Sequence, residues 1–246
     1  MKLRVVGIVL LALSVVALPA LAFAQDVEVE SGEVEVMSGG QAYQSYLAAP
    51  ASGGPYPGIV LIHSFRGLEA GYRTMVDQLA GEGFVVLAVG WQTFEQSPSD
   101  DTMSQLLQDS AAFLSERDDV DPERLGLTGF CAGGRYTMLF LPQLDAFKAG
   151  VAWYGFPYGG DTPPASLVGD LSAPLLIIHG TADDPSPIAD IYQYATELQE
   201  AGAYFELKVY YGEPHGFMLD GGQLRQDEVA QDAFRQMADF FKRKLV

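Results

Sequence analysis

The chain has 246 residues, with 32 acidic and 14 basic side chains, a formal net charge of −18 and one cysteine. Because 48% of the residues are apolar, a disordered chain is excluded, and a lone cysteine excludes a disulfide scaffold or a multi-cysteine zinc site. The acidic balance argues against a nucleic-acid partner, since phosphate neutralisation requires clustered Lys and Arg. The single thiol is then either a small buried hydrophobe or the centre of the chemistry.

Residues 1–24 have the organisation of a secretory signal peptide. A positive start with Lys2 and Arg4 is followed by an apolar stretch and by the small-x-small pattern Ala22-Phe23-Ala24 of a cleavage site. An uncleaved membrane anchor is the alternative, because the apolar stretch is nearly long enough to span a bilayer. We expect cleavage near residue 24, export to the periplasm or the extracellular space, and no stable membrane association afterwards.

The remaining chain, 25–246, alternates between strand and helix patterns. Residues 27–36 alternate apolar and charged side chains, Gly39-Gly40 supplies a turn, and 43–47 continues as a second strand, which together predict an antiparallel hairpin. Apolar runs predict buried strands at 58–63, 84–89, 125–128, 149–154 and 175–179, and residues 205–211 alternate as a last strand. Apolar stripes at helical spacing fall within 72–79, 103–114, 188–198 and 229–241. This order predicts a single α/β domain with a mostly parallel central sheet flanked by helices.

The pentapeptide Gly129-Phe130-Cys131-Ala132-Gly133 lies between a predicted strand and a predicted helix. A nucleophile held in such a tight turn needs flanking positions that are nearly free of side chains, so that the strand and the helix can pack. The helix N-terminus would also favour a thiolate over a thiol. The pattern therefore predicts that Cys131 is a nucleophile.

A nucleophilic thiol needs a base, and the chain has three histidines. His63 and His179 end predicted strands, and His215 lies in a loop between the last strand and the last helix. Asp183 and Asp184 follow another strand and are candidates for the acid. The order nucleophile, acid, histidine is typical of α/β-hydrolases. No paired ligand spacing accompanies His63 or His179, so we expect them to hydrogen-bond locally and expect no metal or cofactor.

Most of the exported part of the chain resembles the dienelactone hydrolase family of α/β-hydrolases. A cysteine at the elbow is the specific element, because most other α/β-hydrolases carry serine there. The resemblance implies a triad of Cys131, Asp183 and His215, with Asp183 as the Asp of the family's G-x-x-D pattern. It also implies an oxyanion hole formed by the backbone N–H groups of Phe65 and Ala132. The segments that carry the resemblance are VLIHSFRGL (60–68), DPERLGLTGFCAGG (121–134), VAWYG (151–155), LLIIHGTADDPSP (175–187) and YYGEPHGF (210–217).

The chain departs from the family pattern in the substrate pocket. The family usually has a glutamate directly after the strand-end histidine, where this chain has Ser64, and an arginine four residues after the catalytic histidine, where this chain has Leu219. Both differences make dienelactone itself a less expected substrate. Ser64 and the aromatic residues Trp91, Trp153 and Tyr154 are candidates for the pocket wall, with core packing as the alternative for the aromatic ones.

Two functional hypotheses follow from these residues. The first is a secreted hydrolase that cleaves small carboxylic esters or lactones through a Cys-His-Asp triad and a thioester acyl-enzyme. The second is an exported binding protein that retains the α/β-hydrolase fold without activity. The sequence does not predict an oligomeric state.

Overall fold

The computed structural model describes residues 27–246 of the chain. The predicted signal peptide, residues 1–24, lies outside the described residues. Among the helices of the described part, none combines the length and the apolar character that crossing a membrane requires.

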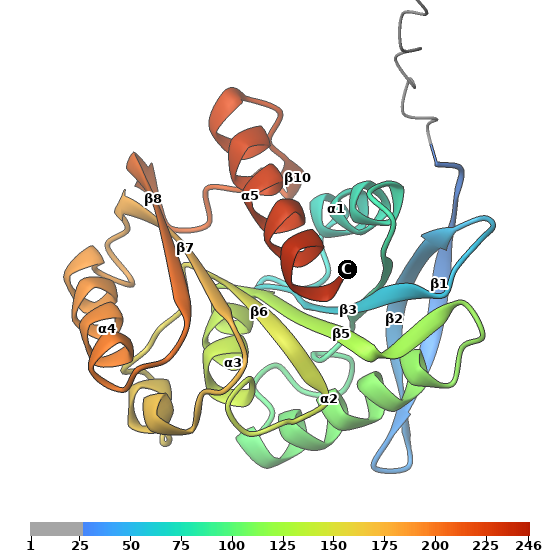
Figure 1. Ribbon diagram of the computed structural model, residues 1–246. Helices are drawn as coiled ribbons and strands as arrows, with labels where there is room; N and C mark the ends of the chain where they lie inside the picture. Colours follow the sequence, from blue (N-terminus) through green and yellow to red (C-terminus); the bar gives the residue numbers. More distant parts are fainter. Residues whose placement is uncertain (1–26) are drawn as a thin grey trace, which may run out of the picture.

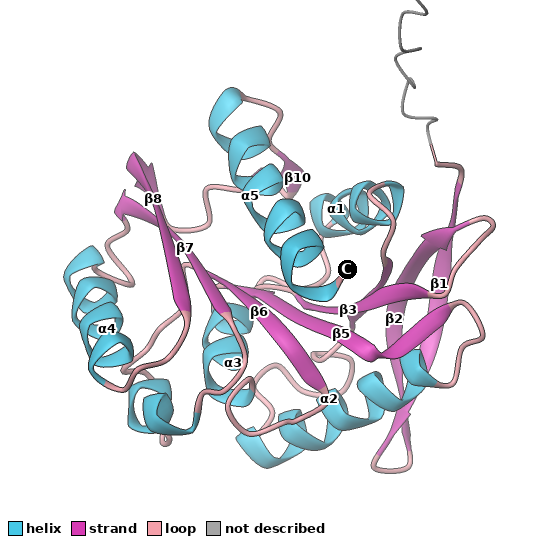
Figure 2. Cartoon of the chain, viewed as in Figure 1, coloured by secondary structure: helices cyan, strands magenta, loops and turns pink. Residues whose placement is uncertain are grey.

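An eight-stranded sheet in the order β1-β2-β4-β3-β5-β6-β7-β8 forms the centre of the molecule (Figures 1 and 2). The predicted N-terminal hairpin is present, and its second strand also pairs antiparallel with β4. All pairings from β4 to β8 are parallel. The predicted α/β fold with a mostly parallel sheet is therefore confirmed. The strands are β1 (Val29–Ser38), β2 (Gln41–Pro50), β3 (Tyr56–Ile62), β4 (Val85–Val89), β5 (Val120–Phe130), β6 (Phe147–Trp153), β7 (Leu175–Ala182) and β8 (Phe205–Pro214).

Helices cover both faces of the sheet (Figure 2). One face packs against α1 (Ala70–Gly81) and α5 (Glu228–Leu245), and the other packs against α2 (Asp100–Ser115), α3 (Ala132–Phe140) and α4 (Ile188–Glu200). A 3₁₀ helix, η1 (Pro164–Asp170), precedes β7. The apolar stripes found in the sequence are the faces by which these helices contact the sheet.

The continuous apolar runs result from this double coverage. In β3, Ile59 and Leu61 belong to the core under α1 and α5, whereas Val60 and Ile62 belong to the core under α2 and α3. Successive side chains of a strand point to opposite faces, so a strand covered on both sides must be apolar at every position.

Two features of the sheet differ from the prediction. Strand β5 begins at Val120, five residues before the predicted run at 125–128, because Val120 and Asp121 pair with the start of β3 ahead of a register shift. A small hairpin of β9 (Leu219–Asp220) and β10 (Gln223–Leu224) precedes α5 and was not predicted. Strands of two residues are too short to show an alternating pattern.

The parallel arrangement brings distant parts of the chain to one edge of the sheet. In the sheet order, β7 and β8 are neighbours and β6 alone separates β5 from β7, so the carboxyl ends of β5, β7 and β8 lie within four consecutive strands. Ligands of open α/β sheets bind at this edge. The loops that follow these three strands contain the predicted nucleophile, acid and base.

Candidate active site

Cys131 occupies a strained turn between β5 and α3. Its backbone has φ 59° and ψ −112°, a region that residues other than glycine seldom adopt. The Cys131 N–H donates to the Trp153 carbonyl oxygen at 3.0 Å, which ties the turn to β6. A Cβ at Gly129 would lie 2.1 Å from the Gly133 carbonyl oxygen, and a Cβ at Gly133 would lie 2.2 Å from that of Ile62. Both flanking glycines are therefore required by close backbone contacts.

The structure brings Cys131, Asp183 and His215 together at the carboxyl edge of the sheet. His215 Nδ1 lies 2.8 Å from Asp183 Oδ2, and His215 and Cys131 line the same cavity. Asp183 is buried, and its Oδ1 accepts the Ser186 N–H at 2.8 Å. Asp184, the other candidate acid, is exposed. The choice of Asp183 over Asp184 therefore agrees with the geometry.

The electrostatics of this group favour a protonated histidine. Burial of the imidazole lowers its pKa, but the hydrogen bonds to Asp183 and Cys131 and the charges of these two groups outweigh burial and raise the pKa of His215 to about 9. A thiolate and an imidazolium are the charge states in which a cysteine nucleophile and its partner start their reaction.

The other two histidines have local structural contacts, as the sequence predicts. His63 Nδ1 donates to the Ser64 carbonyl oxygen at 2.8 Å, and burial lowers the pKa of His63 to about 4. His179 Nε2 donates to the Ser186 carbonyl oxygen at 2.8 Å, and burial lowers its pKa as well. Within residues 27–246, no three His, Cys, Asp or Glu side chains gather as a metal would require.

A cavity of about 230 Å³ opens onto the sulfur. Of the predicted pocket residues, Ser64 and Tyr154 line it, and so does Phe65. Ser64 is buried, and its hydroxyl accepts the Arg66 N–H at 3.2 Å. The cavity is lined by Ser64, Phe65, Arg66, Glu69, Tyr72, Cys131, Tyr154, His215, Gly216, Leu219, Gly221 and Gly222.

Trp91 and Trp153 do not line the cavity, which corrects their assignment as pocket residues. Trp91 is buried, stacks on His63 at 5.2 Å between ring centroids and donates its indole N–H to the His63 carbonyl oxygen. Trp153 is buried, stacks on Phe130 and donates to Thr128 Oγ1 at 3.2 Å. Core packing, the alternative for these residues, describes both.

Tyr72 and Glu69 are among the pocket residues that the sequence did not predict. Tyr72 belongs to the apolar stripe of α1, but it also lines the cavity. Glu69 stands one residue before α1. No local pattern identifies these two, because only the fold brings this end of α1 to Cys131. Leu219, which the family resemblance implied as a pocket position, does line the cavity and begins the unpredicted β9–β10 hairpin.

Phe65 and Ala132 stand where donors to an oxyanion are expected. Phe65 follows β3 in the loop that lines the cavity, and Ala132 is the first residue of α3, directly after the nucleophile. Within the described chain, neither backbone N–H donates to a protein acceptor. Both groups are therefore available to a ligand.

The raised pKa of His215 predicts how stability depends on pH. A histidine whose pKa rises on folding stabilises the folded state below its unfolded pKa, near 6.5, and this contribution is lost as pH rises through about 9. Between pH 7 and pH 10, we expect the difference in unfolding free energy between wild type and His215→Gln to shrink by about 2–3 kcal/mol. Urea unfolding at each pH measures this difference.

His63→Gln is the control for this experiment. Because the pKa of His63 is lowered to about 4, that histidine is neutral throughout this range, and the difference from wild type stays constant. If the unfolding free energies of wild type and His215→Gln changed in parallel between pH 7 and pH 10, the interactions assigned to the His215 imidazole would be contradicted.

Comparisons with known proteins show the family to which the chain belongs. A family model described as "Dienelactone hydrolase family" matches residues 43–90 and 89–245. A "Putative carboxymethylenebutenolidase" of Methylorubrum extorquens is 31% identical over 86% of this chain and 80% of its own length, and one of Salmonella typhimurium is 30% identical over 91% of each chain. The crystal structure of a "Putative Dienelactone Hydrolase" from Klebsiella pneumoniae superposes with a TM-score of 0.79 at 26% identity, covering 87% of this chain and 99% of the other. The chain belongs to the dienelactone hydrolase family of α/β-hydrolases.

Proposed function

We propose that this hydrolase cleaves small carboxylic esters or lactones, with Cys131 as nucleophile, His215 as base and Asp183 as the acid of the triad. The observation that carries the proposal is that Cys131, in its strained turn, shares one cavity with His215, whose Nδ1 lies 2.8 Å from the buried Asp183. The names of the relatives, carboxymethylenebutenolidases, are consistent with an ester or lactone substrate.

The proposed reaction has two steps. In the first, the Cys131 sulfur attacks the carbonyl carbon, and the tetrahedral intermediate collapses to a thioester while His215 gives a proton to the leaving alcohol. In the second, His215 takes a proton from water as that water attacks the thioester, and the acid product leaves with Cys131 restored. Asp183 holds the imidazole in the tautomer that these transfers need. The N–H groups of Phe65 and Ala132 stabilise the oxyanion in both steps, each by about 3 kcal/mol.

Removal of the sulfur is the test of this assignment. We expect Cys131→Ala to lower kcat/KM for short-chain aryl esters and small lactones by at least about a thousandfold, because the variant lacks the atom that forms the thioester in the proposed reaction. Cys131→Ser keeps the size and the turn and serves as the control for folding, with a smaller loss of activity. Hydrolysis of a panel of such substrates measures both variants.

Two outcomes would overturn the proposal. Full activity of folded Cys131→Ala would exclude Cys131 as nucleophile. If the wild type binds members of the panel but turns over none of them, the alternative of an inactive binding protein that retains the fold would replace the hydrolase.

We infer further that the cavity accepts neutral or cationic substrates rather than anionic ones. Glu69 is only 17% exposed in the cavity wall, and its Oε1 lies 3.3 Å from Nε of Arg66, whose side chain is 76% exposed. Solvent screens the arginine more than the carboxylate, so a substrate meets mainly the negative charge. The formal net charge of −18 adds long-range repulsion of anions.

A matched substrate pair tests this charge preference. Acetylcholine and its uncharged analogue 3,3-dimethylbutyl acetate have the same shape, so the ratio of their kcat/KM values isolates the effect of charge. We expect Glu69→Gln to lower this ratio by about fivefold and Arg66→Gln to raise it, since one variant removes the carboxylate and the other removes its partner. A ratio that neither variant changes would contradict the inference.

Export is a further part of the proposal. The positive start, apolar stretch and small-x-small pattern within residues 1–24 support it. We expect the full chain, produced in a bacterial host, to be recovered outside the cytoplasm with Gln25 as its first residue, as read by N-terminal sequencing. Recovery in the membrane fraction with residues 1–24 still present would instead support an uncleaved anchor.

A further inference from the structure

We propose that Arg225 is a positioning residue for His215, because it fixes both flanks of the histidine loop and the base of the hairpin that forms one wall of the cavity. The inference rests on the proposed function. Its test therefore includes a readout that needs no substrate, so that the two can fail separately.

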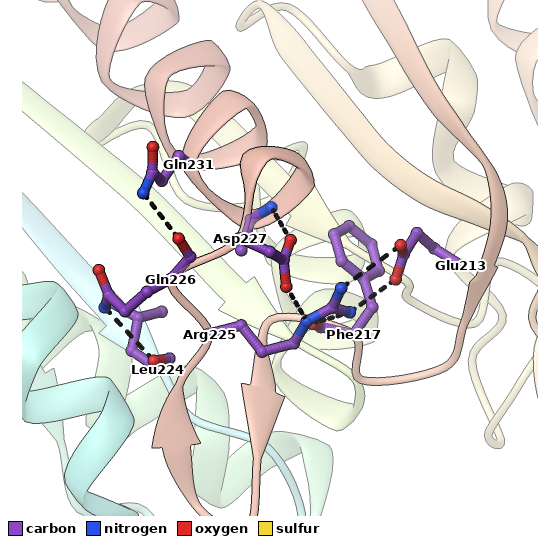
Figure 3. A network of polar contacts seen from close by, with 8 residues as sticks. Glu213, Phe217, Leu224, Arg225, Gln226, Asp227 and Gln231 are labelled. Atoms are coloured by element: carbon purple, nitrogen blue, oxygen red, sulfur yellow. Dashed lines mark hydrogen bonds and ion pairs between the residues drawn. The ribbon is translucent and has the colours of Figure 1, made fainter.

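Arg225 contacts the histidine loop on both sides of His215 (Figure 3). Its Nη1 donates to Glu213 Oε2 at 2.6 Å, two residues before His215. The same nitrogen donates to the Phe217 carbonyl oxygen at 2.8 Å, two residues after it. One guanidinium group thus closes the loop at both ends.

The same arginine anchors the cavity wall. The Arg225 N–H donates to the Met218 carbonyl oxygen at 3.0 Å, which closes the base of the β9–β10 hairpin. Three hairpin residues, Leu219, Gly221 and Gly222, line the cavity. The His215 loop and this wall therefore share one point of attachment.

A third contact connects the arginine to α5. Arg225 Nε donates to Asp227 Oδ2 at 2.6 Å, and Asp227 Oδ1 accepts the Ala230 N–H as the N-cap of the helix. Helix α5 packs on the sheet through buried side chains such as Phe240 and Phe241. Arg225 thus ties the loop to a helix that packs on the sheet through a buried apolar face.

The histidine loop needs such a restraint. Gly212 and Gly216 flank His215 with φ of 76° and 73°, and a Cβ at either position would touch nothing within 4 Å. Glycines in open space leave the backbone free to move. The backbone of this segment is held by the pairing of Pro214 with Ala182 and by the bond of the Leu219 N–H to the Gly216 carbonyl oxygen. Arg225 adds a side chain that bonds to the segment on both sides of His215.

The geometry explains why the residue is arginine. The Arg225 side chain is 24% exposed and that of Glu213 is 14% exposed, so the pair is largely shielded from water. The planar guanidinium of Arg225 donates to the carboxylates of Glu213 and Asp227 and to the Phe217 carbonyl oxygen. A lysine ammonium cannot span these three acceptors.

Four titratable side chains lie around His215. They are Cys131 from the elbow, His179 from β7, Asp183 from the loop after β7, and Tyr154 after β6. Arg225 and Glu213 lie beside the loop and pair with each other. A change at Arg225 should therefore affect the thiol through the position of His215 rather than through its own charge.

The rate of alkylation by iodoacetamide measures how a change at Arg225 affects the thiol, because Cys131 is the single cysteine of the chain. We expect Arg225→Met to slow alkylation at pH 6.5 by about fivefold or more, since a displaced imidazole no longer supports the thiolate. The rates of wild type and variant should converge near pH 10, because the proposed effect depends on a protonated His215, whose pKa is about 9. In the ester assay, kcat should fall about tenfold while KM changes by less than threefold.

Matched variants separate positioning from general stability. Arg117 forms a comparable two-bond pair with Asp119 ahead of β5, at the opposite end of that strand from the elbow, so Arg117→Met should leave the alkylation profile unchanged. Arg225→Lys should recover only part of the rate. Glu213→Gln should slow alkylation, and adding it to Arg225→Met should change little, because the two residues act through one contact.

Three results would overturn the proposal. The first is alkylation of Arg225→Met at the wild-type rate at pH 6.5. The second is a loss of equal size at every pH, which would indicate changed access to the thiol. The third is an equal loss of alkylation rate in Arg117→Met.

If Arg225→Met does not fold, Arg225→Lys and Glu213→Gln are compared with wild type in the same way. Failure to hydrolyse any ester would count against the proposed function and would leave the alkylation result intact.

Discussion

The site depends on the backbone of the elbow. Cys131 adopts a positive φ because β5 must end and α3 must begin within one residue, and the contacts of Gly129 and Gly133 with neighbouring carbonyl groups leave no room for side chains. This turn lifts the sulfur out of the core into the cavity and places the first N–H of α3 beside it. The strain is tolerated because two buried layers hold the strand and the helix in place.

The second constraint is the burial of Asp183. A carboxylate removed from water is stable only when it is well paired, and here the Ser186 N–H and His215 supply the partners. The fold therefore links the stability of the acid to the orientation of the base. The histidine loop therefore has two polar attachments. On the core side, His215 contacts the carboxylate of Asp183, and on the α5 side, Glu213 pairs with Arg225.

Local patterns in the sequence predicted the sheet, the placement of Cys131, Asp183 and His215 after three of its strands, and the need for small residues around Cys131. They did not predict which aromatic side chains line the cavity. A tryptophan such as Trp153 gives the same apolar signal in the sequence whether it packs in the core or lines a cavity. The roles of Glu69 and Arg225 were out of reach for another reason. Each depends on contacts made by a hairpin of two-residue strands, which leaves no periodic signal.

In the proposed reaction, the thiol of Cys131, the single cysteine of the chain, forms a covalent bond with the acyl group of the substrate. Intact-mass spectrometry of the protein after rapid mixing with an aryl ester tests it most directly. We expect an acyl adduct on Cys131 that appears before steady state and decays as product is released. Turnover of the ester with no adduct on Cys131, or with an adduct on another residue, would contradict it.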